Sequence, residues 1–568
     1  MSFWRSFIRL PSNLFFNRWL QSQQQSILSA ATVITAANLL VSVAGLLRDR
    51  FMLSLFAGDE ALLKAYDAFR VAFQVPDLLY QLLIVGALSA SFVPIFTLLK
   101  KKNPKQSFRL VNICMNYLLV FFLVVASLIA IFAPQITAWR IGEAYNQEQI
   151  QIVINLTRLM MLGQLFFAVS SFFSGMLQSY QRFIIPALSP LFYNAGIVLG
   201  AWTLFPVLGI YGAGVGVIFG AFLHMAIQYP AVKQLRWRYR WDWDFDFPGV
   251  KKLFAMMPAR ALTIGMNEIQ SFGLSYFITS VAGFGYTLFL LARTLVNLPI
   301  RFVGVPIGQA ALPFLSNLSD DEDVSRFKKI VLQSLNQIAY LACPAAVLLI
   351  ILRIPIVRLV FGTRNFAWNL TVMVARMVAW MAISIPVQAM FHLLVRAFHA
   401  LRDTMTPFLI SIFTTCVFFI GCALAIKLPD NQLYGITIAI SLSMFIETGL
   451  YLLLLNRKLG HLLNLNFIVT QSKIYLISII MAVSLYIPFK LLDELVFNTS
   501  RVIPLLMLTG ITSVVGLSVY ILLSKLFRIE ELKILTRIFE NFRHRPPKQV
   551  ILALPPTEII SDASENND

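Results

Sequence analysis

Residues 117–133 read YLLVFFLVVASLIAIFA and contain no charged side chain. Similar apolar runs occur at 409–424 (LISIFTTCVFFIGCAL) and at 504–523 (PLLMLTGITSVVGLSVYILL). Such runs are too long for buried strands, and they lack the alternation of a membrane β-barrel. A helix of about 20 apolar residues satisfies its own backbone while it crosses the hydrocarbon core of a bilayer. These stretches therefore predict membrane-spanning helices.

The remainder of the chain has the same character. Of its 568 residues, 58% are hydrophobic and only 13% are charged, and the mean hydropathy is +0.75. A soluble domain usually carries about 25% charged residues, so the composition excludes a water-soluble fold. We predict an all-α polytopic membrane protein with about 14 transmembrane helices. The predicted spans are 27–47, 68–99, 110–139, 151–180, 183–206, 209–232, 252–281, 287–317, 328–362, 370–400, 405–427, 432–456, 472–492 and 502–526.

The formal net charge of +19 is explained by topology rather than by nucleic acid. Basic residues cluster in alternate loops, whereas the loops 140–149 and 492–501 carry few of them. This is the positive-inside pattern, and it predicts that both chain ends lie in the cytoplasm. The sequence has no zinc-knuckle or RNP-like motif, so no nucleic-acid partner is expected. The basic clusters are Arg5, Arg9 and Arg18, the stretch 100–109, the stretch 233–252, and Arg457 with Lys458.

Internal similarity predicts two related halves. Tyr211-Gly212 and Tyr434-Gly435 each open a span rich in small residues, and each follows a turn with an arginine and a proline. Segment 86–94 (GALSASFVP) also resembles 304–313 (GVPIGQAALP), and all matches lie about 220 residues apart. Two six-helix halves related as a parallel repeat, plus two C-terminal helices, account for these matches, and such repeats are typical of secondary transporters. Chance similarity among apolar sequences is the alternative.

The predicted organisation follows from these features. A basic amphipathic segment precedes the first half, and a tail with an acidic, Pro-containing end follows the last helix. The segment 236–249 (RWRYRWDWDFDFPG) lies between the halves, and its aromatic residues predict an interfacial anchor. The predicted regions are 1–26 (cytoplasmic amphipathic segment), 27–235 (first half), 250–457 (second half), 470–527 (two C-terminal helices) and 528–568 (partly disordered cytoplasmic tail).

Several stretches in register carry a family resemblance, from about residue 27 to 457. The stretches are 45–58 (GLLRDRFMLSLFAG), 65–79 (AYDAFRVAFQVPDLL), 86–96 (GALSASFVPIF), 158–200, 298–316 (LPIRFVGVPIGQAALPFLS) and 393–407 (LLVRAFHALRDTMTP). On these stretches the chain resembles MurJ (MviN)-type lipid II flippases, which belong to the MOP superfamily.

The resemblance implies a transporter of the bacterial cytoplasmic (inner) membrane and not an enzyme. The cargo would be the undecaprenyl-pyrophosphate-linked peptidoglycan precursor, moved from the inner to the outer leaflet by alternating access. An anionic pyrophosphate needs a water-filled cationic cavity, because charge is costly in hydrocarbon. Arginine suits this load, since its planar fork makes paired hydrogen bonds to phosphate oxygens. Expected partners are the lipid-linked precursor, membrane lipids and cell-wall synthesis proteins.

Ionisable residues inside the spans are the candidates for the substrate site. Structural pairing or snorkelling is the alternative role for the arginines, and capping of the second helix is the alternative for Asp67. Arg158, Arg376 and Arg396 are expected to be structural. The substrate candidates are Arg48, Asp49, Asp67, Arg70, Arg260, Arg293 and Arg301.

The family pattern is only partly present. Arg48 and Asp49 occupy the Arg-Asp of the GxxRD motif, and Asp67 matches the Asp of the DAF motif. At positions where the family carries other residues, this chain has Ser42 (family arginine), Tyr80 and Gln81 (basic pair), Val85 (glutamate) and Thr294 (arginine). The departures keep open a flippase for another polyprenyl-linked saccharide, or a non-transporting membrane scaffold. A cation-coupled drug exporter fits less well.

No cofactor is expected, but transport needs an energy source. Glu268 beside Asn267 is the candidate for Na⁺ or proton coupling, since an intramembrane carboxylate is a functional hypothesis by default. Pairing of Glu268 with Arg260 is the alternative, and the membrane potential is a further source of energy. The four cysteines (Cys114, Cys343, Cys416 and Cys422) have no metal-ligand spacing and are expected to be packing residues.

Overall fold

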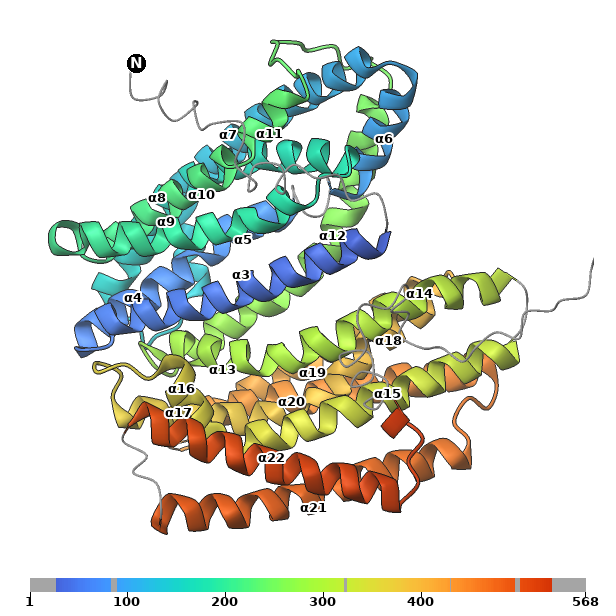
Figure 1. Ribbon diagram of the computed structural model, residues 1–568. Coiled ribbons are helices and arrows are strands. Elements are labelled where there is room, and N and C mark those ends of the chain that lie inside the picture. The colour runs from blue at the N-terminus through green and yellow to red at the C-terminus, as the bar shows by residue number, and fades with distance from the viewer. Residues whose placement is uncertain (1–26, 83–88, 321–323, 430, 496–500, 534–568) are drawn as a thin grey trace, which may run out of the picture. The chain divides into compact units, whose positions relative to one another are not determined.

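The computed structural model describes residues 27–82, 89–320, 324–429, 431–495 and 501–533 (Figure 1). Every regular element in these ranges is helical, as predicted. Within the described ranges, ten helices are long and apolar enough to cross a membrane, or eleven if a pair bent by 48° counts as one span. That pair is α17 (Trp368–Ala382) and α18 (Ile385–Ala400). The total of about 14 spans stays a prediction.

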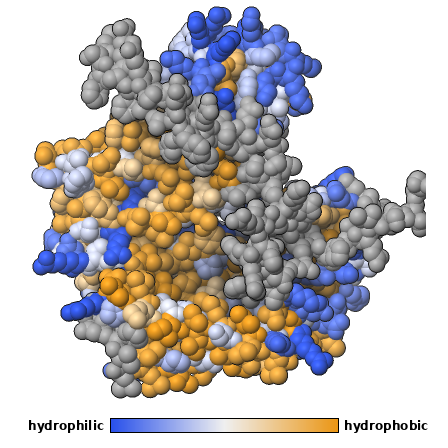
Figure 2. Space-filling model, viewed as in Figure 1, coloured by the Kyte–Doolittle hydropathy of each residue, from blue (hydrophilic) through white to orange (hydrophobic). Residues whose placement is uncertain are grey.

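The most apolar helix shows that the bundle faces lipid. In α7 (Pro104–Arg140), only 17% of the most apolar window is buried inside the protein. Figure 2 shows apolar residues over much of the visible face and hydrophilic ones around the turn between α6 (Ser89–Lys102) and α7. Because an exposed apolar belt of this extent is stable only in hydrocarbon, the chain is a polytopic membrane protein.

The helices form two compact units. Unit 1 comprises residues 1–288 and 360–371. Its other elements are α3 (Ile27–Phe56), α4 (Glu60–Ala72), α5 (Gln74–Tyr80), α8 (Gln147–Ser179), α9 (Ile184–Leu208), α10 (Ile210–Ala226), α11 (Tyr229–Gln234) and α12 (Val250–Thr279).

Unit 2 comprises residues 289–359 and 372–568. The helix that joins it to unit 1 is α13 (Gly285–Pro299), followed by a π-helical segment, η2 (Ile300–Gly304). The predicted halves 27–235 and 250–457 stay a prediction, as does the grouping of 470–527. The remaining elements are α14 (Val305–Asp320), α15 (Val324–Ile351), α16 (Arg353–Phe361), α19 (Met405–Ala425), α20 (Gln432–Leu459), α21 (Leu465–Leu495) and α22 (Val502–Leu526).

Two turns at matching positions of the predicted repeat have the same geometry, one in each unit. Each has a non-glycine residue in the left-handed region two positions after the helix, Gln181 (φ 59°) after α8 and Arg402 (φ 55°) after α18. In each turn the next residue donates its N–H to a carbonyl five residues earlier, which is the bond of a Schellman motif. These bonds are Arg182 N to Leu177 O (2.9 Å) and Asp403 N to Phe398 O (3.0 Å). The two turns agree with the predicted repeat, which stays a prediction.

The hairpins that follow these turns also match. Helices α9 and α10 approach so closely that a Cβ on Gly200 would lie 2.2 Å from the Gly216 Cα. Helices α19 and α20 meet at Gly421 and Ala439, where an added Cβ on Gly421 would lie 3.0 Å from the alanine Cβ. Small residues allow the close helix contacts that stabilise membrane bundles. This contact explains the small-residue spans seen in the sequence.

Asp403 stabilises the turn between α18 and α19. Its carboxylate accepts hydrogen bonds from the Thr406 N–H (3.0 Å) and from Lys458 Nζ (2.5 Å) at the end of α20. Burial raises the pKa of Asp403, but the bonds from Lys458 and Thr406 outweigh this and lower it to about 2. The turn is therefore held by a charged carboxylate at ordinary pH.

The segment between α11 and α12 lies along α7. Trp237 Nε1 donates to Asn112 Oδ1 (3.0 Å), and the Tyr239 hydroxyl donates to Asn116 Oδ1 (2.6 Å). Arg109 forms ion pairs with Asp242 (2.7 Å) and Asp244 (3.0 Å). We call residues 236–249 the linker ribbon. Its predicted role as an interfacial anchor stays a prediction.

Two of the predicted regions lie outside the described residues. These are the amphipathic segment 1–26 and the tail beyond residue 533. Among the cysteines, Cys114, Cys343 and Cys422 are buried, as expected for packing residues, whereas Cys416 is exposed.

We predict that Gly200→Ala destabilises the protein. The added methyl would collide with the α10 backbone, and overpacking of this kind costs about 1–3 kcal/mol. The melting temperature of the purified chain in detergent measures the effect. Gly449→Ala is the control, because nothing lies within 4 Å of a Cβ at that position. Equal melting temperatures for the two variants would contradict the close contact.

Candidate functional site

Three charged residues inside unit 1 form one cluster. The carboxylate of Asp49 accepts hydrogen bonds from Arg48 Nη2 (2.8 Å) and from Arg70 Nη1 (3.0 Å). Arg48 and Asp49 were expected at the end of the first span, but α3 continues to Phe56, so they lie within the helix. The predicted end of the first helix was wrong because it was placed where the apolar run meets the charged residues. The backbone hydrogen bonds of a helix continue through charged residues. We name Arg48, Asp49 and Arg70 the charge cluster.

The charge cluster is mostly shielded from solvent and carries excess positive charge. The side chains of Arg48, Asp49 and Arg70 are 24%, 4% and 13% exposed. One carboxylate faces two guanidinium groups, so one positive charge has no counter-charge within the cluster. In addition, the buried Arg70 Nε has no hydrogen-bond partner. A buried donor without a partner is costly unless a ligand or water satisfies it.

Neighbouring polar groups orient the two arginines. Arg48 Nη1 donates to the Asn194 side chain of α9 (2.9 Å), and the asparagine donates in turn to the Pro190 carbonyl (3.0 Å). Arg70 lies over the Tyr66 ring, 5.9 Å from its centroid. The charge cluster thus links α3, α4 and α9.

Asp67 does not cap its helix, the alternative to substrate binding, and its role in substrate binding stays a prediction. It is fully buried in the second half of α4, so it does not cap that helix. Its carboxylate accepts hydrogen bonds from the Tyr145 hydroxyl and from the Thr287 N–H. The capping alternative was wrong because α4 begins at Glu60, seven positions earlier than Asp67. Asp67 instead joins three segments that are distant in sequence.

More hydrogen bonds secure the same end of unit 1. Gln149 Nε2 donates to the carbonyls of Gly283 (2.6 Å) and Lys64 (3.1 Å). The Gly142 N–H donates to Thr279 Oγ1 (2.9 Å). These bonds fix the α7–α8 and α12–α13 connections against α4, so Asp67 sits in a rigid setting.

Arg140 is a buried cation that the sequence analysis missed. It is 2% exposed, and its guanidinium donates to Gln74 Oε1 (3.2 Å) and to the Val71 carbonyl (3.1 Å). It also lies 5.3 Å from the Phe272 ring centroid, and its Nε has no hydrogen-bond partner. Its position directly after the apolar window 110–139 suggested a loop, although α7 reaches Arg140. The signal that could have identified Arg140 is its place at the end of a long helix.

Two candidate arginines lie in unit 2. Arg293 on α13 and Arg301 in η2 are both exposed. An exposed arginine in an apolar span has to face water or lipid headgroups. Arg301 lies in a π-helical segment, a local irregularity that often accompanies function. The neighbouring Thr294 only returns a hydrogen bond to the Leu290 carbonyl (2.8 Å).

The expected structural arginines have structural partners. Arg158 Nε donates to the Ala130 carbonyl (2.9 Å), and Arg376 lies 5.8 Å from the Tyr434 ring centroid. Arg396 Nη1 donates to the Val305 carbonyl directly after η2 (3.0 Å).

The remaining candidates are placed only in part. Arg260 and Asn267 belong to α12, but their side chains lie outside the described residues, as does Val85. Glu268 is half-buried on the same helix. Where the family carries cations, Ser42 hydrogen-bonds the Asn38 carbonyl and Tyr80 packs on Phe167. In the described part of the chain, no three His, Cys, Asp or Glu side chains are grouped to hold a metal ion.

Two solved structures share the fold of this chain. The chain aligns with the structure titled "Lipid II flippase MurJ, inward closed conformation" with a TM-score of 0.71, at 19% identity, over 87% of this chain and 98% of that one. It aligns with an inward-facing multidrug resistance MATE family transporter of the MOP superfamily with a TM-score of 0.60, at 14% identity, over 76% of this chain and 98% of that one. At these identities the two alignments show a shared fold.

Sequence comparison identifies the family. Residues 62–506 match the model of the family described as "Lipid II flippase MurJ", and the chain belongs to this family. The lipid II flippase MurJ of Burkholderia cenocepacia is 26% identical over 68% of this chain and 76% of its own length. The probable lipid II flippase MurJ of Thermotoga maritima is 25% identical over 87% and 95%, respectively.

We predict that Asp49→Asn destabilises the protein strongly. Without the carboxylate, two guanidinium groups remain together in a buried site, and breaking a buried ion pair costs about 3–5 kcal/mol. Thermal unfolding in detergent measures the loss. Glu494→Gln is the matched control, since it breaks an exposed pair with Lys490 and should change stability by less than about 1 kcal/mol. A melting temperature unchanged by Asp49→Asn would show that the cluster does not hold these helices.

Proposed function

We propose that this chain flips lipid II, the undecaprenyl-pyrophosphate-linked peptidoglycan precursor, from the inner to the outer leaflet of the bacterial cytoplasmic membrane. Membership of the lipid II flippase MurJ family supports the substrate class. The alternation of basic loops supports an orientation with both termini in the cytoplasm. No covalent step is needed, because the cargo changes leaflet without changing its bonds.

The charge cluster is the observation that carries the proposal. A shielded site with two arginines and one carboxylate retains net positive charge for a pyrophosphate. Asp49 holds both guanidinium groups in fixed orientations, which lowers the entropy cost of binding. Donors that Asp49 leaves unused can then make paired bonds to phosphate oxygens. Unit 2 contributes two further exposed arginines, Arg293 and Arg301.

We propose that movement follows alternating access. The headgroup crosses in a water-filled cationic cavity while the polyprenyl tail stays in lipid, so neither part enters an unfavourable solvent. Rocking of one repeat against the other is the usual mechanism for transporters built from repeats. The titles of the similar structures name inward closed and inward-facing conformations of those proteins.

Energy coupling is assigned to Glu268 together with Asn267 on α12. A carboxylate and an amide at neighbouring positions in the sequence offer oxygen ligands for Na⁺, or the carboxylate alone can carry a proton. The membrane potential is the competing source, since a net positive site responds to the field. Transport that persists in Glu268→Gln, but stops when the potential is collapsed, would assign coupling to the potential.

Another polyprenyl-linked saccharide is the second candidate cargo. Four positions that carry cations in the family pattern are Ser42, Tyr80, Gln81 and Thr294 in this chain. A different headgroup would call for a different set of contacts in the cavity, while the pyrophosphate and the tail would stay the same. Arg48 and Arg70 would serve both cargoes.

The test is complementation. Expressed in a bacterium depleted of its own lipid II flippase, the chain should restore growth and outer-leaflet lipid II. Arg48→Ala and Arg70→Ala should each reduce transport by about tenfold or more, because each removes a charge-assisted contact to phosphate. Arg158→Ala is the control, since Arg158 is exposed and bound only to a neighbouring helix carbonyl. Membrane levels of every variant are measured in parallel.

Two outcomes would contradict the proposal. Failure of the well-expressed wild-type chain to restore outer-leaflet lipid II would move the assignment to another polyprenyl saccharide or to a scaffold. Rescue that persists in both arginine variants would remove the charge cluster from the transport path, even if lipid II remained the cargo.

A further inference from the structure

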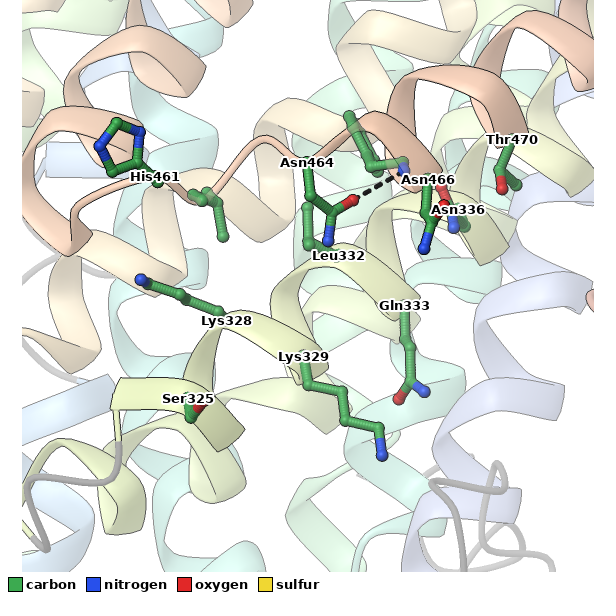
Figure 3. A pocket seen from close by; sticks show the side chains of 12 residues that line it. Ser325, Lys328, Lys329, Leu332, Gln333, Asn336, His461, Asn464, Asn466 and Thr470 are labelled. Carbon is green, nitrogen blue, oxygen red and sulfur yellow. Dashed lines mark hydrogen bonds between the residues drawn. The ribbon is translucent and has the colours of Figure 1, made fainter.

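A second polar site lies in unit 2, apart from the charge cluster. It is a pocket of about 350 Å³ between the first turns of α15 and the segment 461–470, which includes the start of α21. This volume falls in the range of small-molecule sites. Its walls include Lys328, Lys329, Gln333, His461, Asn464 and Asn466 (Figure 3).

The chemistry of the wall favours an anion. Lys328 and Lys329 supply two positive charges, and none of the described lining residues is acidic. In Figure 3, the Lys328 side chain extends toward the turn that carries His461. Lys328 Nζ donates to the Gly460 carbonyl, which leaves its other N–H groups for a ligand. Asparagine and glutamine side chains provide further donors around the same space.

The backbone on the opposite wall of the pocket also favours an anion. Gly460 (φ 64°) and His461 (φ 54°) are both left-handed, so the chain turns sharply at the end of α20. The Asn456 side chain fixes this turn by accepting the Leu463 N–H (2.8 Å). Asn464 then accepts the Phe467 N–H (2.8 Å), the pattern of a helix cap. The start of α21, with its positive helix dipole, therefore borders the pocket.

Apolar side chains beside the pocket indicate where the rest of the ligand goes. Leu465, Ile468 and Val469, in the first turns of α21, are 74%, 52% and 42% exposed. A basic pocket next to exposed apolar residues at the end of a membrane helix matches the two halves of a lipid, a phosphate in the pocket and acyl chains along the helix.

We propose that this pocket binds the phosphate of an anionic phospholipid headgroup, held by Lys328, Lys329 and the start of α21. The orientation given under the proposed function places this end of the bundle at the inner leaflet, which is rich in anionic lipid. The lipid anchors the α15–α21 contact to the membrane surface. The site is independent of the transported cargo, so transport can fail while this assignment stands.

Native mass spectrometry of the full-length chain, released from nanodiscs of phosphatidylcholine with phosphatidylglycerol, tests the assignment. The wild type should retain phosphatidylglycerol. The double variant Lys328→Gln, Lys329→Gln should bind it more weakly, by a factor of roughly ten at least. Lys101→Gln with Lys102→Gln is the matched control, because it neutralises an adjacent, exposed pair at the end of α6. The charge-keeping variant Lys328→Arg, Lys329→Arg should retain the lipid, which separates loss of charge from misfolding.

Two results would overturn the assignment. One is phosphatidylglycerol retention that is equal in the wild type and in the Lys328→Gln, Lys329→Gln variant. The other is inorganic pyrophosphate that binds the lipid-free wild type with the same lysine dependence and displaces phosphatidylglycerol, which would assign the pocket to a soluble phosphate. Lack of displacement by pyrophosphate supports the lipid.

Discussion

The ion pairs of Asp49 with Arg48 and Arg70 are the constraint on which unit 1 depends. Three charges taken out of water are tolerated only when each is paired or hydrogen-bonded, and here one carboxylate serves two guanidinium groups. The pairing fixes the spacing of α3 and α4, and Asn194 extends it to α9. Because two cations share one anion, the same contact that holds the helices together also leaves the site positive. Structure and proposed substrate affinity therefore come from one interaction.

Most of the fold could be predicted from the sequence, because a bilayer permits few solutions. Long apolar runs allow only helices, so the all-helical fold followed from the composition. The helix ends were less accessible. Helix α3 continues past Arg48 because its backbone hydrogen bonds do not depend on hydropathy. The predicted span 68–99 is interrupted at Phe73, which lies between α4 and α5.

The candidate site was predicted only in part, for a physical reason. Charged residues in a span were recognisable one by one, so Arg48, Asp49 and Arg70 were found. Their partners were not, because a hydrogen bond such as that from the Thr287 N–H to Asp67 joins positions far apart in sequence. Arg140 was missed because its contacts with Gln74 and Phe272 form only in the folded chain. A pattern along the chain records residue types, whereas a site is defined by which of them meet.

The linker ribbon has a consequence for how the chain meets a protease. Three of its residues, Arg236, Arg238 and Arg240, would make it a ready substrate for trypsin by composition alone. A protease needs a segment that can leave the surface and extend into its active site. Asn112 and Asn116 hold the ribbon along α7 through its aromatic side chains and its backbone carbonyls. These bonds restrain the ribbon where it carries its three arginines, so resistance to trypsin there would come from α7 rather than from a covering domain.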